Sequence, residues 1–308
     1  MRIAIVGIGG VGAAFGAPLA AAGEDVVFVA RGETLRALKE HGLILESEDG
    51  SLVLPELHAT DDPASLPPVD AILLAVKSWQ VGDAARLAAP MVGPHTVVVP
   101  LQNGVEATER ATSALGPGPV AVGLCGTVSW IVAPGRIRSA GGIRYIQFAE
   151  PDGRPSARLE RLRDAFVRAG VRAEIPQDVG AALWRKFLFI APIGAIGAAS
   201  RVPIGTIRAV PESRALLERG MREVLALARA RGIGLPDAVI GETMRFTDSL
   251  GAGATSSLHR DLIEGRRSEL DDLAGAVVRL GREAGVPVPV HETLYASLLP
   301  LELAARVR

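Results

Sequence analysis

The N-terminal segment, residues 1–12, constrains the fold more strongly than any other part of the chain. Residues 3–6 are an unbroken apolar run, which is typical of a parallel strand buried on both faces. Three glycines with the spacing G-x-G-x-x-G follow; they allow a tight turn, the approach of a pyrophosphate to the backbone, and close packing of a helix on the strand. The segment therefore predicts a dinucleotide-binding turn at the start of a helix, formed by Gly7, Ile8, Gly9, Gly10, Val11 and Gly12.

A helix and a second strand are expected after the glycine-rich turn. The helix carries its apolar residues on one side, and Pro18 inside it predicts a kink or an irregular turn. The second strand, residues 25–30, is followed by Arg31, nineteen positions after Gly12. At this distance an acidic residue would hold the ribose 2′-hydroxyl of NAD, whereas an arginine accommodates the 2′-phosphate of NADP. Arg31 therefore favours NADP(H), and the alternative is an ordinary surface arginine.

Length and composition indicate two domains and exclude several classes of function. The chain has 308 residues, more than one hydrophobic core usually serves, and its net charge of −1 offers no basic surface for nucleic acid. A single cysteine excludes an internal disulfide, and the five histidines lack the spacing of metal ligands, so no metal is expected. The uncharged apolar run at residues 187–200 is too short to span a bilayer. Without a signal peptide either, we expect a cytoplasmic protein that does not bind a membrane.

Strand and helix signals alternate in the first part of the chain, and helical signals dominate the rest. Further strands are expected at 43–45, 52–54, 70–76, 96–100, 120–124, 137 and 143–148, with helices to about 89, from 105 and at 156–169. Asp49-Gly50 predicts a hairpin between the strands at 43–45 and 52–54. Later helices are expected at 179–199, 212–231, 237–250, 256–264, 269–284 and 292–307. The predicted fold class is α/β, an N-terminal Rossmann-type doubly wound domain (1–175) followed by an all-α C-terminal domain (176–308).

The chain has only three lysines among its 33 basic residues, Lys39, Lys77 and Lys186. Because arginine serves elsewhere, a retained lysine indicates a position that needs an ammonium able to release a proton; chance placement is the alternative. Lys39 belongs to a solvated helix face. Lys77 and Asn103 directly follow predicted strand ends, where α/β sheets bind ligands, so we expect Lys77 to contact the cofactor and Asn103 to line the pocket. A simple Asn-Gly turn is the other interpretation of Asn103.

Several motifs recur in a fixed order along the chain. They are Gly7-x-Gly9-x-x-Gly12, Arg31, Val76-Lys77-Ser78-Trp79-Gln80, Gln102-Asn103-Gly104, Trp184-Arg185-Lys186, and Ser256-Ser257 with Glu269. In order and spacing they resemble the ketopantoate reductase (2-dehydropantoate 2-reductase) family over essentially the whole chain. The resemblance implies a Rossmann domain, a helical second domain, NADPH as cofactor, and a role in pantothenate biosynthesis. It also allows a homodimer through the helical domain.

The resemblance assigns roles to individual residues. Lys186 would donate a proton to the substrate carbonyl, Asn103 and Ser257 would contact the substrate, and Asn103 and Glu269 would contact the cofactor, with Glu269 also near the lysine. Hydride delivery to a ketone builds negative charge on oxygen, which needs a proton within hydrogen-bond reach. Burial in an apolar helix would lower the pKa of Lys186 toward neutrality. The structural alternatives are a solvent-directed Lys186, a helix-dipole role for Glu269 at the start of its helix, and an N-cap role for Ser257.

Three positions depart from the family's pattern. Substrate-holding asparagines four and eight residues after the lysine correspond to Ile190 and Gly194, and a third corresponds to Ile204. These replacements predict a less polar substrate pocket of different shape. Because a site that hydrogen-bonds hydroxyls discriminates strongly, the loss of these donors should change the preferred substrate.

The predicted function is NADPH-dependent reduction of a 2-oxo acid, ketopantoate or a close analogue, with Lys186 as proton donor. One alternative is a hydroxy-acid dehydrogenase that acts in the oxidative direction on a less polar substrate. Another is a non-catalytic NADP(H)-binding sensor. A sensor would have little reason to retain Lys186, Asn103, Ser257 and Glu269 together.

Overall fold

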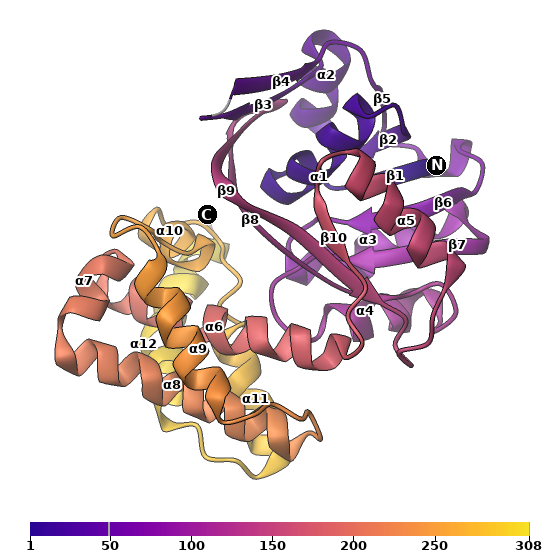
Figure 1. Ribbon diagram of the computed structural model, residues 1–308. Helices are drawn as coiled ribbons and strands as arrows, with labels where there is room; N and C mark the ends of the chain where they lie inside the picture. Colours follow the sequence, from indigo (N-terminus) through magenta and orange to yellow (C-terminus); the bar gives the residue numbers. More distant parts are fainter. Residues whose placement is uncertain (49, 308) are drawn as a thin grey trace. The chain divides into compact units, whose positions relative to one another are not determined.

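The computed structural model describes residues 1–48 and 50–307, without the side chains at positions 141 and 143. The chain forms two compact units; in Figure 1 the first is coloured from indigo to rose and the second, apart from residues 103–105, from salmon to yellow. The first contains Met1–Gln102 and Glu106–Val179, and the second contains Asn103–Val105 and Gly180–Arg308. The sequence placed the division slightly earlier, after residue 175, and did not anticipate that Asn103–Val105 would join the helical unit.

A five-stranded sheet forms the centre of the first unit. Its strands are β1 Arg2–Val6, β2 Asp25–Val29, β5 His58–Thr60, β6 Val69–Leu74 and β7 Val92–Pro100. They lie in the order β5-β2-β1-β6-β7, and every neighbouring pair is parallel. The chain changes direction across the sheet between β1 and β6, because β2 and β6 lie on opposite sides of β1. This confirms the predicted Rossmann-type sheet and identifies its topological switch point.

Helices cover both faces of this sheet, and β1 contributes side chains to each face. The helices of the unit are α1 Gly10–Ala21, α2 Gly32–His41, α3 Val81–Ala88, α4 Ala107–Leu115 and α5 Ala157–Arg168, with single turns η1 Pro63–Ser65, η2 Ser78–Gln80 and η3 Ala89–Met91. Ile3 and Ile5 belong to the hydrophobic cluster that includes α1, whereas Ala4 and Val6 belong to the cluster that includes α3 and α4. All four side chains are buried, as expected for a strand inside a parallel sheet.

A second sheet in the same unit is built around one long strand. Its strands are β3 Leu43–Ser47, β4 Gly50–Leu54, β8 Val122–Ala133, β9 Arg136–Ala149 and β10 Arg172–Glu174. β9 pairs antiparallel with β8 and parallel with β3 and β10. β3 and β4 form the predicted hairpin, although Asp49 lies outside the described residues. The short separate strands expected at 120–124, 137 and 143–148 are wrong in extent, because β8 and β9 form one long hairpin through the polar and glycine-containing stretches between them.

Helix α1 is enclosed between the two sheets. It contacts β1 and β2 on one side and β3, β4, β8 and β9 on the other, and it is buried continuously from Gly12 to Leu19. The prediction of a helix that is apolar on one side was therefore wrong, because α1 has no solvent-facing side along this length. The helix continues through Pro18 to Ala21, and the amide of Ala22 donates to the Pro18 carbonyl at 3.0 Å, so the expected irregular turn is absent.

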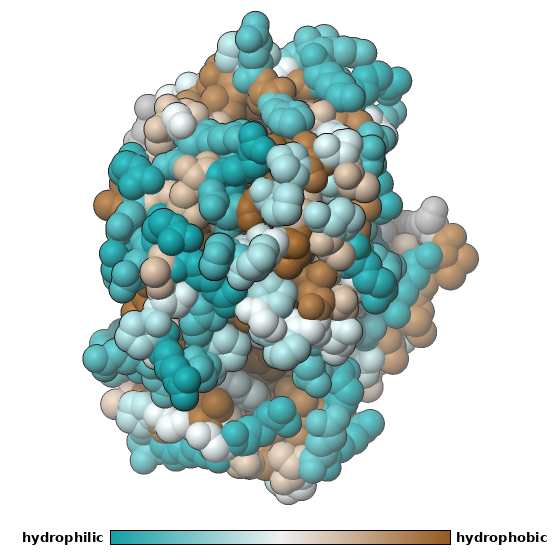
Figure 2. All heavy atoms as spheres, turned by 90° about the vertical axis from the view of Figure 1, so that its right-hand side faces the viewer, coloured by the Kyte–Doolittle hydropathy of each residue, from teal (hydrophilic) through white to brown (hydrophobic). Residues whose placement is uncertain are grey.

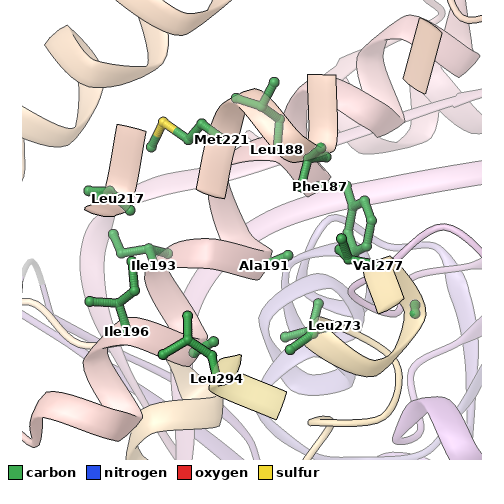
Figure 3. Packing of buried hydrophobic residues seen from close by; sticks show 14 of the residues in the cluster. Phe187, Leu188, Ala191, Ile193, Ile196, Leu217, Met221, Leu273, Val277 and Leu294 are labelled. Atoms are coloured by element: carbon green, nitrogen blue, oxygen red, sulfur yellow. The ribbon is translucent and has the colours of Figure 1, made fainter. Parts of the chain in front are cut away.

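The second unit is helical, as predicted. Its helices are α6 Val179–Ser200, α7 Ile204–Ala209, α8 Pro211–Ala230, α9 Ala238–Ser249, α10 Ser257–Ile263, α11 Ala274–Ala284 and α12 Pro289–Arg306. Figure 3 shows side chains of α6, α8 and α12 in one shared core, with Phe187 beside Val277 of α11. By length and composition α6 could cross a membrane, but 61% of its most apolar stretch is buried inside this core. Burial by neighbouring helices accounts for its apolar sequence. On the face shown in Figure 2, hydrophilic side chains predominate and apolar ones are scattered.

One helix starts later than the sequence predicted. The expected helix at 269–284 is regular only from Ala274, and residues 269–273 form an irregular turn. Within this turn the amides of Asp272 and Leu273 donate to the carbonyl of Glu269 at 3.1 and 3.0 Å, and the amide of Gly275 donates to Leu270 at 2.9 Å. Glu269 therefore lies before the helix rather than in its first turn, and compensation of the α11 dipole does not explain it.

Candidate active site

The strand ends at the switch point bring three predicted site residues to one edge of the first sheet. Gly7, Arg31 and Lys77 follow β1, β2 and β6, which are neighbouring parallel strands. Backbone hydrogen bonds continue past the strands, since the Gly7 amide donates to Val29 at 3.1 Å and the Ala75 amide donates to Val6 at 2.8 Å. Ligands of open α/β sheets bind at this edge.

Glycine is present at each of the three positions of the turn for a different geometric reason. Gly7 has φ +96°, and a Cβ there would lie 2.7 Å from Val76 Cγ1. A Cβ on Gly12 would lie 2.0 Å from the Gly7 carbonyl oxygen, so α1 can pack against the turn only with glycine at this position. A Cβ on Gly9 would meet no atom within 4 Å. The first and third glycines are thus required by packing, and the second leaves open space beside the N-terminus of α1, as a bound pyrophosphate requires.

Strand β8 supplies a contact that the sequence did not predict. A Cβ on Gly10 would lie 2.5 Å from the carbonyl oxygen of Ser129, so β8 passes directly against the first turn of α1. The hydroxyls of Ser129 and Thr127 hydrogen-bond to each other at 2.7 Å. Gly10 and Ser129 are more than a hundred positions apart in the sequence, so no local motif could reveal the contact between them.

Arg31 lies just after the end of β2, at the same edge of the sheet as the glycine-rich turn. It precedes the first residue of α2 at the end of β2, and its side chain is exposed. Its guanidinium makes no ion pair with any residue that the structure describes. A cation at this position is therefore available to a ligand, which is compatible with both the cofactor role and the surface alternative.

Lys77 lies in a turn that Gln102 fastens to the sheet. Its side chain is half-buried, its ammonium lies 5.9 Å from the centre of the Trp79 ring, and its amide donates to Gln80 Oε1 at 3.3 Å. Gln102 is buried, and its Nε2 donates to the carbonyls of Leu74 and Val76 at 2.8 and 2.9 Å. Gln102 therefore holds the end of β6 and the start of the Lys77 turn, a structural role within the Gln-Asn-Gly motif.

In the helical unit, one face of α6 carries Lys186, Ile190 and Gly194 at intervals of four residues. Lys186 and Ile190 are half-buried, whereas Gly194 is buried. A Cβ on Gly194 would lie 3.1 Å from Leu258 Cδ2 and 3.5 Å from Ser256 Oγ. The space of a side chain at 194 is thus occupied by the start of α10.

The first residues of α10 pack against the face of α6 that carries Gly194. Ser256 is the N-cap, since its hydroxyl accepts from the His259 amide at 3.0 Å. Ser257 is therefore not the N-cap, and its half-buried hydroxyl has no hydrogen-bond partner in the described part of the chain. The ring of His259 packs on Gly197, where a Cβ would lie 3.0 Å from Nδ1. Burial and the nearby Arg260 lower the pKa of His259, so this ring is neutral at pH 7.

Asn103 and Glu269 come from distant parts of the sequence to the same region of the helical unit. Gly104 has φ +99°, and a Cβ on it would lie 2.8 Å from the carbonyl oxygen of Asp272. The loop that carries Asn103 therefore rests on the turn that begins with Glu269. Glu269 is buried, and the half-buried Asn103 amide makes no side-chain hydrogen bond among the described residues.

Ile204 occupies a different environment from the other two substituted positions. It is buried at the first residue of α7 within the core of the helical unit, and its amide donates to the Ala254 carbonyl at 3.1 Å. Among the described residues, no cluster of side chains could hold a metal ion. The predicted residues thus form two sets: the glycine-rich turn, Arg31 and Lys77 in the first unit, and Asn103, Lys186, Ile190, Gly194, Ser257 and Glu269 in the second.

Comparison with known protein families gives matches over both units. Residues 3–153 match the family model described as ketopantoate reductase PanE/ApbA, and residues 178–302 match its C-terminal domain. The chain is 30% identical to the uncharacterized oxidoreductase YkpB of Bacillus subtilis over 301 residues, which cover 97% of this chain and 98% of the relative.

Solved structures show the same architecture over almost the whole chain. The crystal structure of 2-dehydropantoate 2-reductase from Geobacter metallireducens has a TM-score of 0.91 at 30% identity and covers 97% of this chain and 99% of its own. A ternary structure of D-mandelate dehydrogenase with NADH and anilino(oxo)acetate also has a TM-score of 0.91, with coverage of 99% and 100%. Its identity is 22%, so this second likeness concerns the fold alone.

Alanine substitutions at Gly12 and Gly9 should separate packing from ligand binding. Gly12→Ala forces a Cβ against the Gly7 carbonyl and should destabilise the protein by about 1–3 kcal/mol or more, the usual cost of overpacking. Gly9→Ala should leave the melting temperature nearly unchanged and weaken NADPH binding, because its Cβ enters only open space. Thermal unfolding with and without NADPH measures both effects. A Gly9→Ala variant with full NADPH stabilisation would show that the cofactor does not approach this turn.

Proposed function

The chain belongs to the ketopantoate reductase family, and on that premise we propose that it reduces a 2-oxo acid to the 2-hydroxy acid with NADPH. The observation that carries the proposal is the glycine-rich turn, in which Gly7 and Gly12 are fixed by packing while the space beside Gly9 is open. The nicotinamide, when bound, supplies hydride to C2 of the substrate. The chain itself must hold the cofactor and deliver a proton to the ketone oxygen. A cytoplasmic location, a place in pantothenate biosynthesis and a homodimer through the helical unit belong to the same proposal.

The residues of the first unit fit an anionic dinucleotide. Gly9 is the N-cap of α1 and has open space beside it, so the free amides of the first turn can bind a pyrophosphate there, which the helix dipole favours. Arg31 is exposed at the end of the adjacent strand, which supports a contact with the 2′-phosphate of NADP rather than with the hydroxyl of NAD. Lys77 follows the next strand on the other side of β1 and would bind the cofactor there.

The residues of the second unit would bind and protonate the substrate. Lys186 is half-buried on α6, where its chain neighbours Trp184 and Phe187 are 6% and 1% exposed, and its ammonium would donate to the developing alkoxide. Ser257 and Asn103 carry polar groups without a side-chain hydrogen bond among the described residues, and these would bind the carboxylate or carbonyl of a 2-oxo acid. We assign the buried Glu269 a role beside the lysine and the cofactor.

The substituted positions support a substrate with fewer hydroxyls than ketopantoate. Ile190 presents an apolar side chain four residues after Lys186 on the same helical face. An asparagine side chain at 194 would compete for space with Leu258 and Ser256, so this position contributes shape rather than a hydrogen bond. Ile204 is part of the core and is expected to act only through packing. A hydroxyl left unpaired beside Ile190 would cost about 1–3 kcal/mol, whereas each buried CH₂ would gain about 0.8 kcal/mol.

Replacement of Arg31 tests the cofactor assignment. A charged hydrogen bond to the 2′-phosphate contributes about 1.5–3 kcal/mol, so Arg31→Ala should weaken NADPH binding by about ten- to a hundredfold and leave NADH binding nearly unchanged. Arg36→Ala is the matched control, since Arg36 is exposed on α2, the helix that Arg31 precedes. Fluorescence titration with each nucleotide measures the affinities. Equal affinities of the unmodified protein for both nucleotides would contradict the role of Arg31.

Replacement of Lys186 tests the proton-donor assignment. Lys186→Ala should lower kcat by about 10²–10⁴, the usual effect of losing a general acid, with little change in NADPH affinity. Lys186→Arg should not restore activity, because the guanidinium remains protonated. Lys39→Ala, which removes an exposed lysine of α2, should leave kcat unchanged. An active Lys186→Arg enzyme would mean that the position needs only positive charge.

A further inference from the structure

A buried carboxylate on the last helix is tied to the residue that precedes Glu269. Glu302 of α12 is 0% exposed. Its Oε2 accepts from the amide of Ser268 at 2.9 Å and from the Ser268 hydroxyl at 2.6 Å, and its Oε1 accepts from Arg306 Nε at 2.8 Å. A buried carboxylate is costly unless its oxygens are hydrogen-bonded, and these three bonds meet that need. Glu302 thus fastens the N-terminal side of the Glu269 turn to α12.

A second connection fastens the other side of the same turn. Arg306 also pairs with Asp271, whose Oδ1 accepts from the hydroxyl of Tyr295 at 2.9 Å. Although burial alone would raise the pKa of Asp271, the hydrogen bonds from Arg306 and Tyr295 hold it below its ordinary value. The Tyr295 ring lies close to Gly275, where a Cβ would be 2.9 Å from it. Ser268, Glu302, Arg306, Asp271 and Tyr295 therefore form one continuous network, which we call the α12 clamp.

The turn held by the α12 clamp is irregular and carries two elements of the proposed site. Its residues precede the regular part of α11, and their backbone hydrogen bonds span three, four and five residues instead of forming the regular ladder of an α-helix. It contains Glu269, and the carbonyl of Asp272 supports Gly104, the neighbour of Asn103. Fixing this turn to α12 fixes the backbone on which both side chains depend.

We propose that Glu302, Arg306 and Asp271 are positioning residues, which hold the Ser268–Leu273 turn so that Glu269 is presented in one orientation to the reacting groups. The inference rests on the proposed role of Glu269. Supporting residues of this kind limit the freedom of a functional side chain, and small misplacements of such groups are costly to catalysis. The clamp acts through Glu269 and does not itself touch the substrate.

The test uses Arg306→Met, which keeps the apolar stem of a partly exposed side chain and removes both of its charged contacts. The matched control is Arg222→Met on α8. Arg222 pairs with Glu218 at the same i,i+4 spacing, but both partners are exposed, at 61% and 40%. We expect kcat/KM of Arg306→Met to fall about ten- to a hundredfold, with no loss for Arg222→Met. Glu302→Gln should act in the same direction, because an amide cannot accept from Ser268 and from Arg306 at once.

A double-mutant cycle separates positioning from a general structural effect. In a Glu269→Gln background, Arg306→Met should cause little further loss of kcat/KM, since the side chain it orients has already been altered. A full additional loss, or no loss in the single variant, would overturn the proposal. If Glu269→Gln itself leaves turnover unchanged, the proposed role of Glu269 fails and the clamp's catalytic purpose fails with it.

Hydrogen exchange tests the clamp independently of turnover. The amides of Asp272 and Leu273, which bond to the Glu269 carbonyl, should exchange faster in Arg306→Met than in the unmodified protein. Amides in α8 should be unaffected. Unchanged exchange at residues 272 and 273 would show that the turn does not depend on α12, and would overturn the proposal whatever the enzyme's activity.

Discussion

The close contact between α1 and the turn after β1 is the constraint on which the first unit depends. Gly12 packs on the Gly7 carbonyl with no room for a side chain, and Gly10 packs on Ser129 of β8, where a Cβ would lie 2.5 Å from the carbonyl oxygen. The helix is therefore held against two sheets at its first turn, with its free amides fixed in direction. Because the adjacent space beside Gly9 stays open, tight packing and an anion site are produced by the same few residues.

In the helical unit, glycines on α6 also allow close packing of a neighbouring element. Gly194 and Gly197 let α10 approach the helix that carries Lys186, and the approach brings Ser256 and Leu258 to the place of a missing side chain. The substitution at 194 is thus more than the loss of an amide, because a neighbouring helix fills the space. Ile190 lies on the same face, so the side of α6 that follows Lys186 is apolar. The proposed function therefore keeps the family's reaction and assigns the chain a less hydroxylated substrate.

The sequence predicted the parts of the structure that depend on local spacing. The glycine turn, the buried β1, Arg31 after β2 and the long helices of the second unit all follow from patterns within a few residues. The sequence could not predict that β8 and β9 would enclose α1, because that contact joins Gly10 to Ser129 and depends on long-range pairing. The sequence also predicted that the helix α11 starts at Glu269, because Leu270, Leu273 and Val277 have helical spacing. In the structure the turn before Ala274 is held by α12 instead. The burial of Gly194 under Leu258 was equally inaccessible, since spacing cannot show what faces a glycine.

A competition experiment with labelled cofactor tests the central claim most directly. The protein is incubated with NADPH carrying two deuterium atoms at C4 of the nicotinamide, together with equal concentrations of ketopantoate and 3,3-dimethyl-2-oxobutanoate, its analogue without the hydroxyl. Mass spectrometry of the products measures both hydride transfer and the ratio of the two kcat/KM values. We predict 2-hydroxy acids with one deuterium at C2, and more product from the analogue than from ketopantoate. Products without deuterium would contradict the proposed reaction, and an excess of labelled pantoate would contradict the account of Ile190 and Gly194.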